Sequence, residues 1–166
     1  MRAVKRERSK FKEEASLFQF DLIFFFIPRW WSVKEETSDQ ITFYRQDTHY
    51  DWFAQFKKTP SSLSFKEFVE DYFTRRKIIL DDRVDTTENP KHLFKNSEMH
   101  TFFHQGVRFE GTGTENQVDR IYLDVYFLQR GNFYFVFESK SSVLNGGIEG
   151  PYFEEAIYLA KVKNDD

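Results

Sequence analysis

The sequence predicts a single α+β domain. Three observations predict it: two aromatic-rich runs at 121–140 that form a β-hairpin, a capped amphipathic helix at about 62–77, and a final helix at about 151–163. The chain has 166 residues, 40% of them hydrophobic, which is enough to bury a core of its own. We expect the domain to span 18–166, after a basic N-terminal tail at 1–17.

Composition and charge narrow the classes of partner. The net charge of −3 gives no general attraction to nucleic acids or anionic membranes. The absence of cysteine excludes disulfides, thiolate metal sites and a cysteine nucleophile. The apolar run at 22–27 is far shorter than the ~20 residues that a membrane span needs, and no small-residue cleavage site follows it. As sequenced, the chain is expected in the cytoplasm; it would be exported if a signal precedes the sequence given.

The first half of the domain is expected to be strand-rich. A continuous apolar strand ends at Pro28, and Trp30 and Trp31 follow as a lid over one end of the core. A second strand alternates apolar and polar side chains, and a third returns after a turn and ends at Pro60. These strands are expected at 18–27, 40–45 and 52–58, with the turn at 47–51.

The helix at 62–77 is predicted by its start signal and its period. Ser64 and Glu67 have the spacing of a capping box, in which the serine side chain accepts from the backbone N–H three residues later. The residues that follow place one apolar stripe over two turns: Phe65, Phe68, Val69, Tyr72 and Phe73. Burying each ring contributes roughly 1.5–3 kcal/mol, so this helix is expected to lie on a sheet.

The second half of the chain has weaker signals. We expect a short strand at 78–80, a long mobile loop at 81–97, a strand or bent strand pair at 98–110, a turn-rich connection at 111–116 and a loop at 141–150. Pro151 suits the first position of the final helix, because proline lacks the N–H that this position leaves unpaired.

The register of the 121–140 hairpin decides which side chains share a face. An odd loop, Gln129-Arg130-Gly131 with Gly131 left-handed, would place Phe133, Phe135 and Phe137 on the face of Ile121, Leu123 and Val125. An even loop would invert one run relative to the other. The odd loop gives one continuous apolar face, so we expect it, with Asp124, Glu138 and Lys140 together on a solvated face.

That polar trio leaves an enzymatic alternative open. Asp124 followed by Glu138-Ser139-Lys140 resembles the signature of PD-(D/E)XK nucleases, in which two carboxylates hold Mg²⁺ and the lysine activates water. Asp119 or Glu115 could supply a further carboxylate. A Glu-x-Lys pattern is also common on the wet face of a sheet, where charged side chains pair across strands, and this interpretation is favoured here. Nucleic acid is a partner, and magnesium a cofactor, only under the nuclease alternative.

The order of patterns along residues 20–163 resembles a known domain type. The first strand runs into Ile27-Pro28-Arg29-Trp30-Trp31, the middle helix starts with Leu63-Ser64-Phe65, and a hairpin leads to a phenylalanine-containing last helix. This order resembles the DcrB-related and PsbP-like families. The resemblance implies an α/β/α sandwich around a mostly antiparallel sheet, without catalytic residues or cofactor. Domains of these families act as exported lipoproteins, extrinsic photosystem subunits and chaperones for secreted effectors.

The expected function is therefore that of a non-catalytic binding or assembly module whose partner is another protein. The candidate contact surface comprises four aromatic residues expected to be exposed, together with the loop at 81–97. These aromatic residues are Trp30, Trp31, Tyr50 and Trp52. For the tryptophans, packing at the edge of the core is the favoured explanation.

Overall fold

The computed structural model describes residues 15–46, 51–83, 90–145 and 147–163. The elements, in chain order, are β1 (Ser16–Phe20), β2 (Ile23–Ile27), β3 (Trp31–Thr37), β4 (Gln40–Arg45), β5 (Phe53–Pro60), α2 (Phe65–Arg76), β6 (Ile78–Leu80), η1 (Pro90–His92), α3 (Ser97–Phe102), β7 (Gln105–Glu115), β8 (Asp119–Arg130), β9 (Phe133–Ser142), η2 (Val143–Asn145), α4 (Gly150–Tyr158) and β10 (Lys161–Val162). Because β1 begins at Ser16, the domain begins slightly before the predicted boundary. Most of the predicted basic tail lies outside the described residues.

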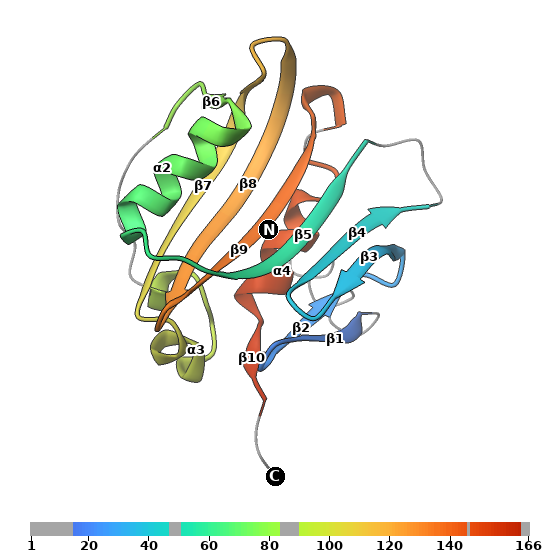
Figure 1. Cartoon of the computed structure of the whole chain (residues 1–166). Coiled ribbons are helices and arrows are strands. Elements are labelled where there is room, and N and C mark those ends of the chain that lie inside the picture. The colour runs from blue at the N-terminus through green and yellow to red at the C-terminus, as the bar shows by residue number, and fades with distance from the viewer. Residues whose placement is uncertain (1–14, 47–50, 84–89, 146, 164–166) are drawn as a thin grey trace.

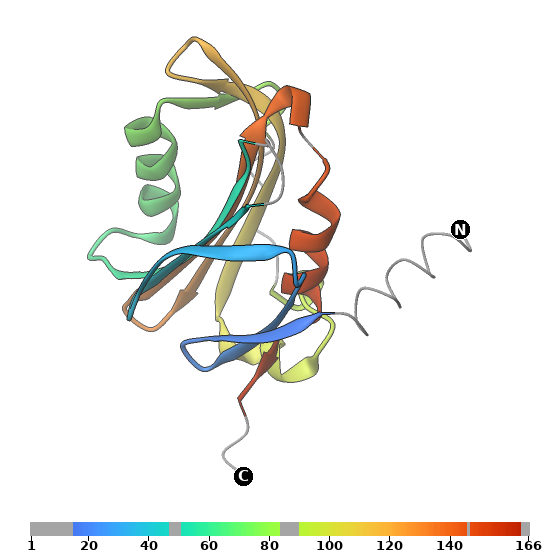
Figure 2. The ribbon, with the colours of Figure 1, turned by 90° about the vertical axis from the view of Figure 1, so that its right-hand side faces the viewer.

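The fold is α+β with a central antiparallel sheet, as predicted. Seven strands lie in the order β3-β4-β5-β9-β8-β7-β6, and every neighbouring pair is antiparallel. Figure 1 shows α2 lying over the side of this sheet made by β7 and β8, and Figure 2 shows α4 on the opposite face. A smaller sheet of order β1-β2-β10, which the sequence did not predict, shares that second face with α4. No helix in the described part of the chain has the length and apolarity required to cross a membrane.

The hairpin register is the even one, so the predicted odd loop was wrong. Arg130 pairs with Phe133, which leaves a two-residue loop with Gly131 at φ +60°. Tyr126 consequently pairs with Phe137, and Val125 pairs with Glu138. Both faces of the hairpin are apolar because both are covered: one by α2, the other by α4, α3 and the β1–β2 hairpin. The assumption of one wet face led to the wrong register.

The capped helix was predicted well. It runs from Phe65 to Arg76, and the Ser64 side chain accepts from the Glu67 backbone N–H at 3.2 Å. Val69 and Phe73 are buried against β7 and β8, where Phe73 meets Phe109 edge-on at 5.3 Å between ring centroids. Lys77 ends the helix in the left-handed conformation, with its N–H donating to the Phe73 and Thr74 carbonyls.

Three other segments differ from expectation. The single strand predicted at 18–27 is a hairpin, because Asp21 adopts φ +55° and turns the chain between β1 and β2. Residues 97–102 form the short helix α3 instead of the start of a strand, and it buries Met99 and Phe102. The glycine-rich 111–116 stretch is mostly the end of β7, not a turn. Gly113 is required there because a Cβ would lie 2.3 Å from the Ile79 carbonyl oxygen of β6.

The remaining predictions are mixed. Strands β4, β5 and β6 lie where the sequence placed them, whereas β3 was not predicted. Pro151 lies at the start of α4, whose Phe153, Ala156 and Ile157 are fully buried, but this helix ends at Tyr158 and the chain continues into β10. The predicted turn at 47–51 lies mostly outside the described residues.

Candidate functional site

The predicted catalytic trio does not converge. Asp124 pairs with Ser139 across the hairpin, so it lies on the face opposite Glu138 and Lys140. A metal ion cannot be shared by carboxylates on the two sides of a β-sheet. The nuclease alternative requires Asp124, Glu138 and Lys140 to share one face, and that prediction was wrong.

Glu138 belongs to a buried ion-pair network beneath α2. Its side chain is 2% exposed and accepts two hydrogen bonds from the Arg76 guanidinium, at 2.8 and 3.1 Å, and one from the Tyr72 hydroxyl. Arg76 also reaches Glu115 at 3.2 Å, and Lys140 binds the other Glu115 oxygen at 2.5 Å. Burial and the neighbouring Glu138 carboxylate raise the pKa of Tyr72, so its hydroxyl stays protonated and donates.

This network occupies the position in which the nuclease alternative would place a metal ion. Glu138 and Glu115 are the two carboxylates that share a face with Lys140, but the Arg76 guanidinium already bridges them. Within the described ranges, no three His, Cys, Asp or Glu side chains are grouped so that they could hold a metal ion. The arrangement thus neutralises its carboxylates with fixed cations of the chain.

Asp124 is neutralised in the same way on the other face of the sheet. It is fully buried and accepts two hydrogen bonds from the Arg108 guanidinium, both at 2.9 Å. Arg108 also contacts Glu110 at 2.8 Å and Glu154 of α4 at 3.4 Å. Burial raises the pKa of Asp124 to about 6, although the Arg108 guanidinium opposes the shift. This pair joins α4 to the sheet.

The tryptophans expected on the surface lie mainly inside. Trp31 and Trp52 are 6% and 5% exposed, so the expectation that they are exposed was wrong, and packing at the edge of the core explains them. The Trp52 indole donates to Ser139 at 2.9 Å. Trp30 is half-buried, and it joins Trp31 in donating to the buried Glu149 carboxylate. Tyr50 lies outside the described residues.

The predicted contact loop at 81–97 is ordered on both of its sides, while its residues 84–89 lie outside the described ranges. Leu93 and Phe94 are buried in the main core. Asp81 binds the Arg120 guanidinium at 2.6 Å, and these contacts lower its pKa to about 2. The described parts of this segment are thus integrated into the fold.

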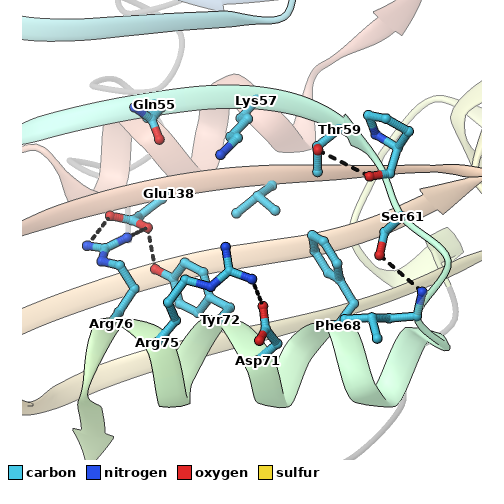
Figure 3. A pocket seen from close by; sticks show the side chains of 13 residues that line it. Gln55, Lys57, Thr59, Ser61, Phe68, Asp71, Tyr72, Arg75, Arg76 and Glu138 are labelled. Carbon is cyan, nitrogen blue, oxygen red and sulfur yellow. Dashed lines mark hydrogen bonds and ion pairs between the residues drawn. The ribbon is translucent and has the colours of Figure 1, made fainter.

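A groove lies between α2 and β5 on the sheet face that carries α2. Its volume is about 330 Å³ (Figure 3). Val136 lies at its floor, β5 contributes Gln55, Lys57 and Thr59, and α2 contributes Phe68, Tyr72 and Arg75. The groove exists because α2 packs over β7 and β8, and none of the described helices covers β5, β4 and β3 on this face (Figure 1).

The polar and apolar side chains of the groove are segregated. Lys57 from β5 and Arg75 from α2 point toward one another from opposite walls (Figure 3). Lys57 is exposed and, among the described residues, has no hydrogen-bond or ion-pair partner. Arg75 is 76% exposed and pairs with Asp71 one turn earlier. Phe68 stacks on Tyr134 with 4.2 Å between ring centroids, which gives the groove an apolar wall beside the two cations.

Sequence reasoning missed this groove and the cations around it. Arg76 could have been found, because it follows Tyr72 by four residues and so continues the apolar stripe of α2. An arginine on a buried stripe predicts a buried carboxylate beneath it. Arg108, Glu149 and Lys57 carry no such local signal. Their roles depend on which strands become neighbours.

Comparisons with known proteins show similarity at the level of fold. No protein-family model matches the chain, and no curated protein matches it. A Bacteroides thetaiotaomicron structure matches 92% of the chain with a TM-score of 0.51 at 12% identity, and the chain spans half of that protein's length. A protein of unknown function from Pseudomonas aeruginosa, suggested to be a regulator, matches 86% of the chain and 93% of its own length, with a TM-score of 0.50 at 12% identity.

A third solved structure is the Ran-binding protein Mog1p of Saccharomyces cerevisiae. It matches 78% of the chain and 77% of its own length, with a TM-score of 0.47 at 10% identity. The first two structures establish that this arrangement of helices and sheet occurs in other proteins. At 12% identity they show the fold alone and leave the function to be argued from the site.

Proposed function

We propose that the protein is a non-catalytic binding or assembly module that engages another protein through the groove between α2 and β5. One observation carries the proposal: α2 packs over β7 and β8 and leaves a groove beside β5, with an apolar wall and a lysine that has no partner among the described residues. Concave sites with an apolar lining and a few placed polar groups are the usual form of binding sites.

The buried charges support a binding role over a catalytic one. Glu138 and Asp124 each accept two hydrogen bonds from an arginine, and such an arrangement holds a carboxylate in place instead of presenting it to a substrate. Among the described side chains, no buried nitrogen or oxygen lacks a hydrogen-bond partner. The proposal requires neither a metal nor a cofactor.

The resemblance of the sequence to DcrB-related and PsbP-like domains belongs to the same proposal. The α+β fold with helices on both faces of an antiparallel sheet agrees with what that resemblance implies. A lipoprotein-type, chaperone or complex-accessory role would each use a protein-binding surface of this kind. The partner is expected to bind on the α2 face.

Site-specific photo-crosslinking in cells of the source organism tests this function. A photoreactive residue at Lys57, in the groove, should yield a discrete crosslinked product with another protein. The matched control is the same residue at Glu98, which is exposed on α3. Equal products from both positions, or none from Lys57, would contradict the assignment of the groove.

A further inference from the structure

Resting on the proposed function, we infer that the groove takes an extended segment of the partner protein in which an acidic side chain lies next to an apolar one. The acidic side chain would lie between Lys57 and Arg75, and the apolar side chain would contact Val136 and Phe68.

The two cations are placed to receive a carboxylate. Lys57 and Arg75 point toward one another from opposite walls (Figure 3), and an anion between them would attract both and offset their mutual repulsion. The existing pair of Arg75 with Asp71 is an exposed helix-surface pair, with side chains 76% and 40% exposed. Such pairs contribute little to stability, so Arg75 can exchange or share its partner at small cost.

The apolar contacts lie directly beside these cations. Val136 of β9, the strand partner of Lys57, lines the groove, and the Phe68 ring is held in place by its stack on Tyr134 at 4.2 Å. Leu63, 36% exposed, extends the apolar lining beyond Phe68. A volume of about 330 Å³ is at the lower end of the range of small-molecule pockets, roughly 300–1,000 Å³. It suits two neighbouring side chains of a peptide.

The charge balance disfavours a polyanion. Asp71 and Glu138 also line the groove, and the whole chain has a net charge of −3. A nucleic acid would bring many phosphates to a surface with few cations, whereas one carboxylate matches the Lys57–Arg75 pair.

The groove must recognise the side chains of the partner segment and not its backbone. From Phe53 to Lys57, β5 is paired on both sides, with β4 and with β9, so the partner segment cannot be added there as a further strand. Specificity would therefore depend on the charge between Lys57 and Arg75 and on the apolar floor.

A phage-displayed library of random linear peptides, selected on the intact protein, provides the test. Peptides selected on the wild type should be enriched in Asp or Glu adjacent to Leu, Ile or Phe. Selection on the Lys57→Glu/Arg75→Glu variant should instead enrich Lys or Arg, and this variant should bind wild-type-selected peptides about tenfold or more weakly. The Lys66→Glu/Lys95→Glu variant makes the same charge change at exposed positions outside the groove and should select as the wild type does.

A Thr59→Trp variant separates this inference from the proposed function, because the added ring would fill the groove from β5. Peptides that Thr59→Trp no longer binds, but that show no preference for acidic residues, would overturn the acidic segment and leave the groove as the binding site. Peptides whose binding is unaffected by Thr59→Trp would overturn both. Circular dichroism and urea unfolding of each variant confirm that the fold is retained.

Discussion

The Arg76→Met substitution tests the buried network beneath α2. It removes two hydrogen bonds to Glu138, at 2.8 and 3.1 Å, and leaves a carboxylate that is 2% exposed with the Tyr72 hydroxyl as its remaining donor. Removing one partner of a buried ion pair costs about 3–5 kcal/mol, because the remaining charge stays desolvated. Arg76 itself is 31% exposed, so we expect a loss of about 3 kcal/mol of unfolding free energy, near the lower limit.

Urea denaturation of four proteins measures this effect as a double-mutant cycle. The proteins are the wild type, Arg76→Met, Glu138→Met and the double variant. The double variant should be more stable than the sum of the single losses predicts, by about 1.5–3 kcal/mol, because two apolar side chains replace the pair. Arg120→Met is the matched control, since its pair with Asp81 has both side chains 46% exposed and should contribute less than about 1 kcal/mol.

The same cycle tests the hairpin register. In the odd-loop register predicted from the sequence, Glu138 would lie in water, and Arg76→Met would cost no more than Arg120→Met. A loss below about 1 kcal/mol with no coupling energy would therefore refute the two-residue loop and the burial of Glu138.

Three further predictions follow from buried or close contacts. Burial raises the pKa of Asp124 from 3.8 to about 6, so the folded state binds this proton more tightly than the unfolded state, and the resulting stability is present below pH 3.8 and lost as the pH rises through 6. In urea titrations, the difference in unfolding free energy between wild type and Asp124→Asn should therefore fall by up to about 3 kcal/mol from pH 4 to pH 7. A difference that does not depend on pH would contradict the shift. Gly113→Ala should detach β6 from β7, because the added Cβ would lie 2.3 Å from the Ile79 carbonyl oxygen. We expect the unfolding free energy to fall by about 1–3 kcal/mol and amide exchange at 78–80 to become faster. Unchanged exchange would be inconsistent with the close approach. Glu149→Leu removes the carboxylate that accepts a hydrogen bond from the Trp31 indole at 2.9 Å, so the tryptophan fluorescence spectrum of the folded state should shift. Glu98→Leu, at an exposed position on α3, should leave the spectrum unchanged.

The elements predicted correctly are those with strong local signals. Ser64 and Glu67 fix the start of α2, Pro60 ends β5, and Pro151 starts α4. Each signal acts within a few residues, through a cap or through the restricted backbone of proline. Such features are present in the sequence before any tertiary contact forms.

The hairpin register could not be read from one strand pair. Its prediction assumed a solvated face, but α4 and the β1–β2 hairpin cover the face of Phe135 and Phe137, while α2 covers that of Val125. When both faces are buried, alternation no longer identifies the core side. The turn at Asp21 was missed for a related reason, since a non-glycine residue at positive φ gives a weak sequence signal.

The groove could not be predicted from the sequence because it arises where α2 leaves part of the sheet uncovered. The pattern of α2 shows which side chains it buries, but not that they lie on β7 and β8 and leave β5 open. Lys57 and Arg75 are 18 positions apart in the sequence and line the same groove only because α2 folds back beside the strand that precedes it. A local motif does not describe such a pair.

Hydrogen–deuterium exchange of the protein with and without a bound partner or a selected peptide tests the groove most directly. The groove assignment predicts added protection at 53–60 and 65–76, the two segments that form its walls, with α3, α4 and β1 unchanged. Protection confined to α4, α3 or the β1–β2 hairpin would show that the protein binds through its other face.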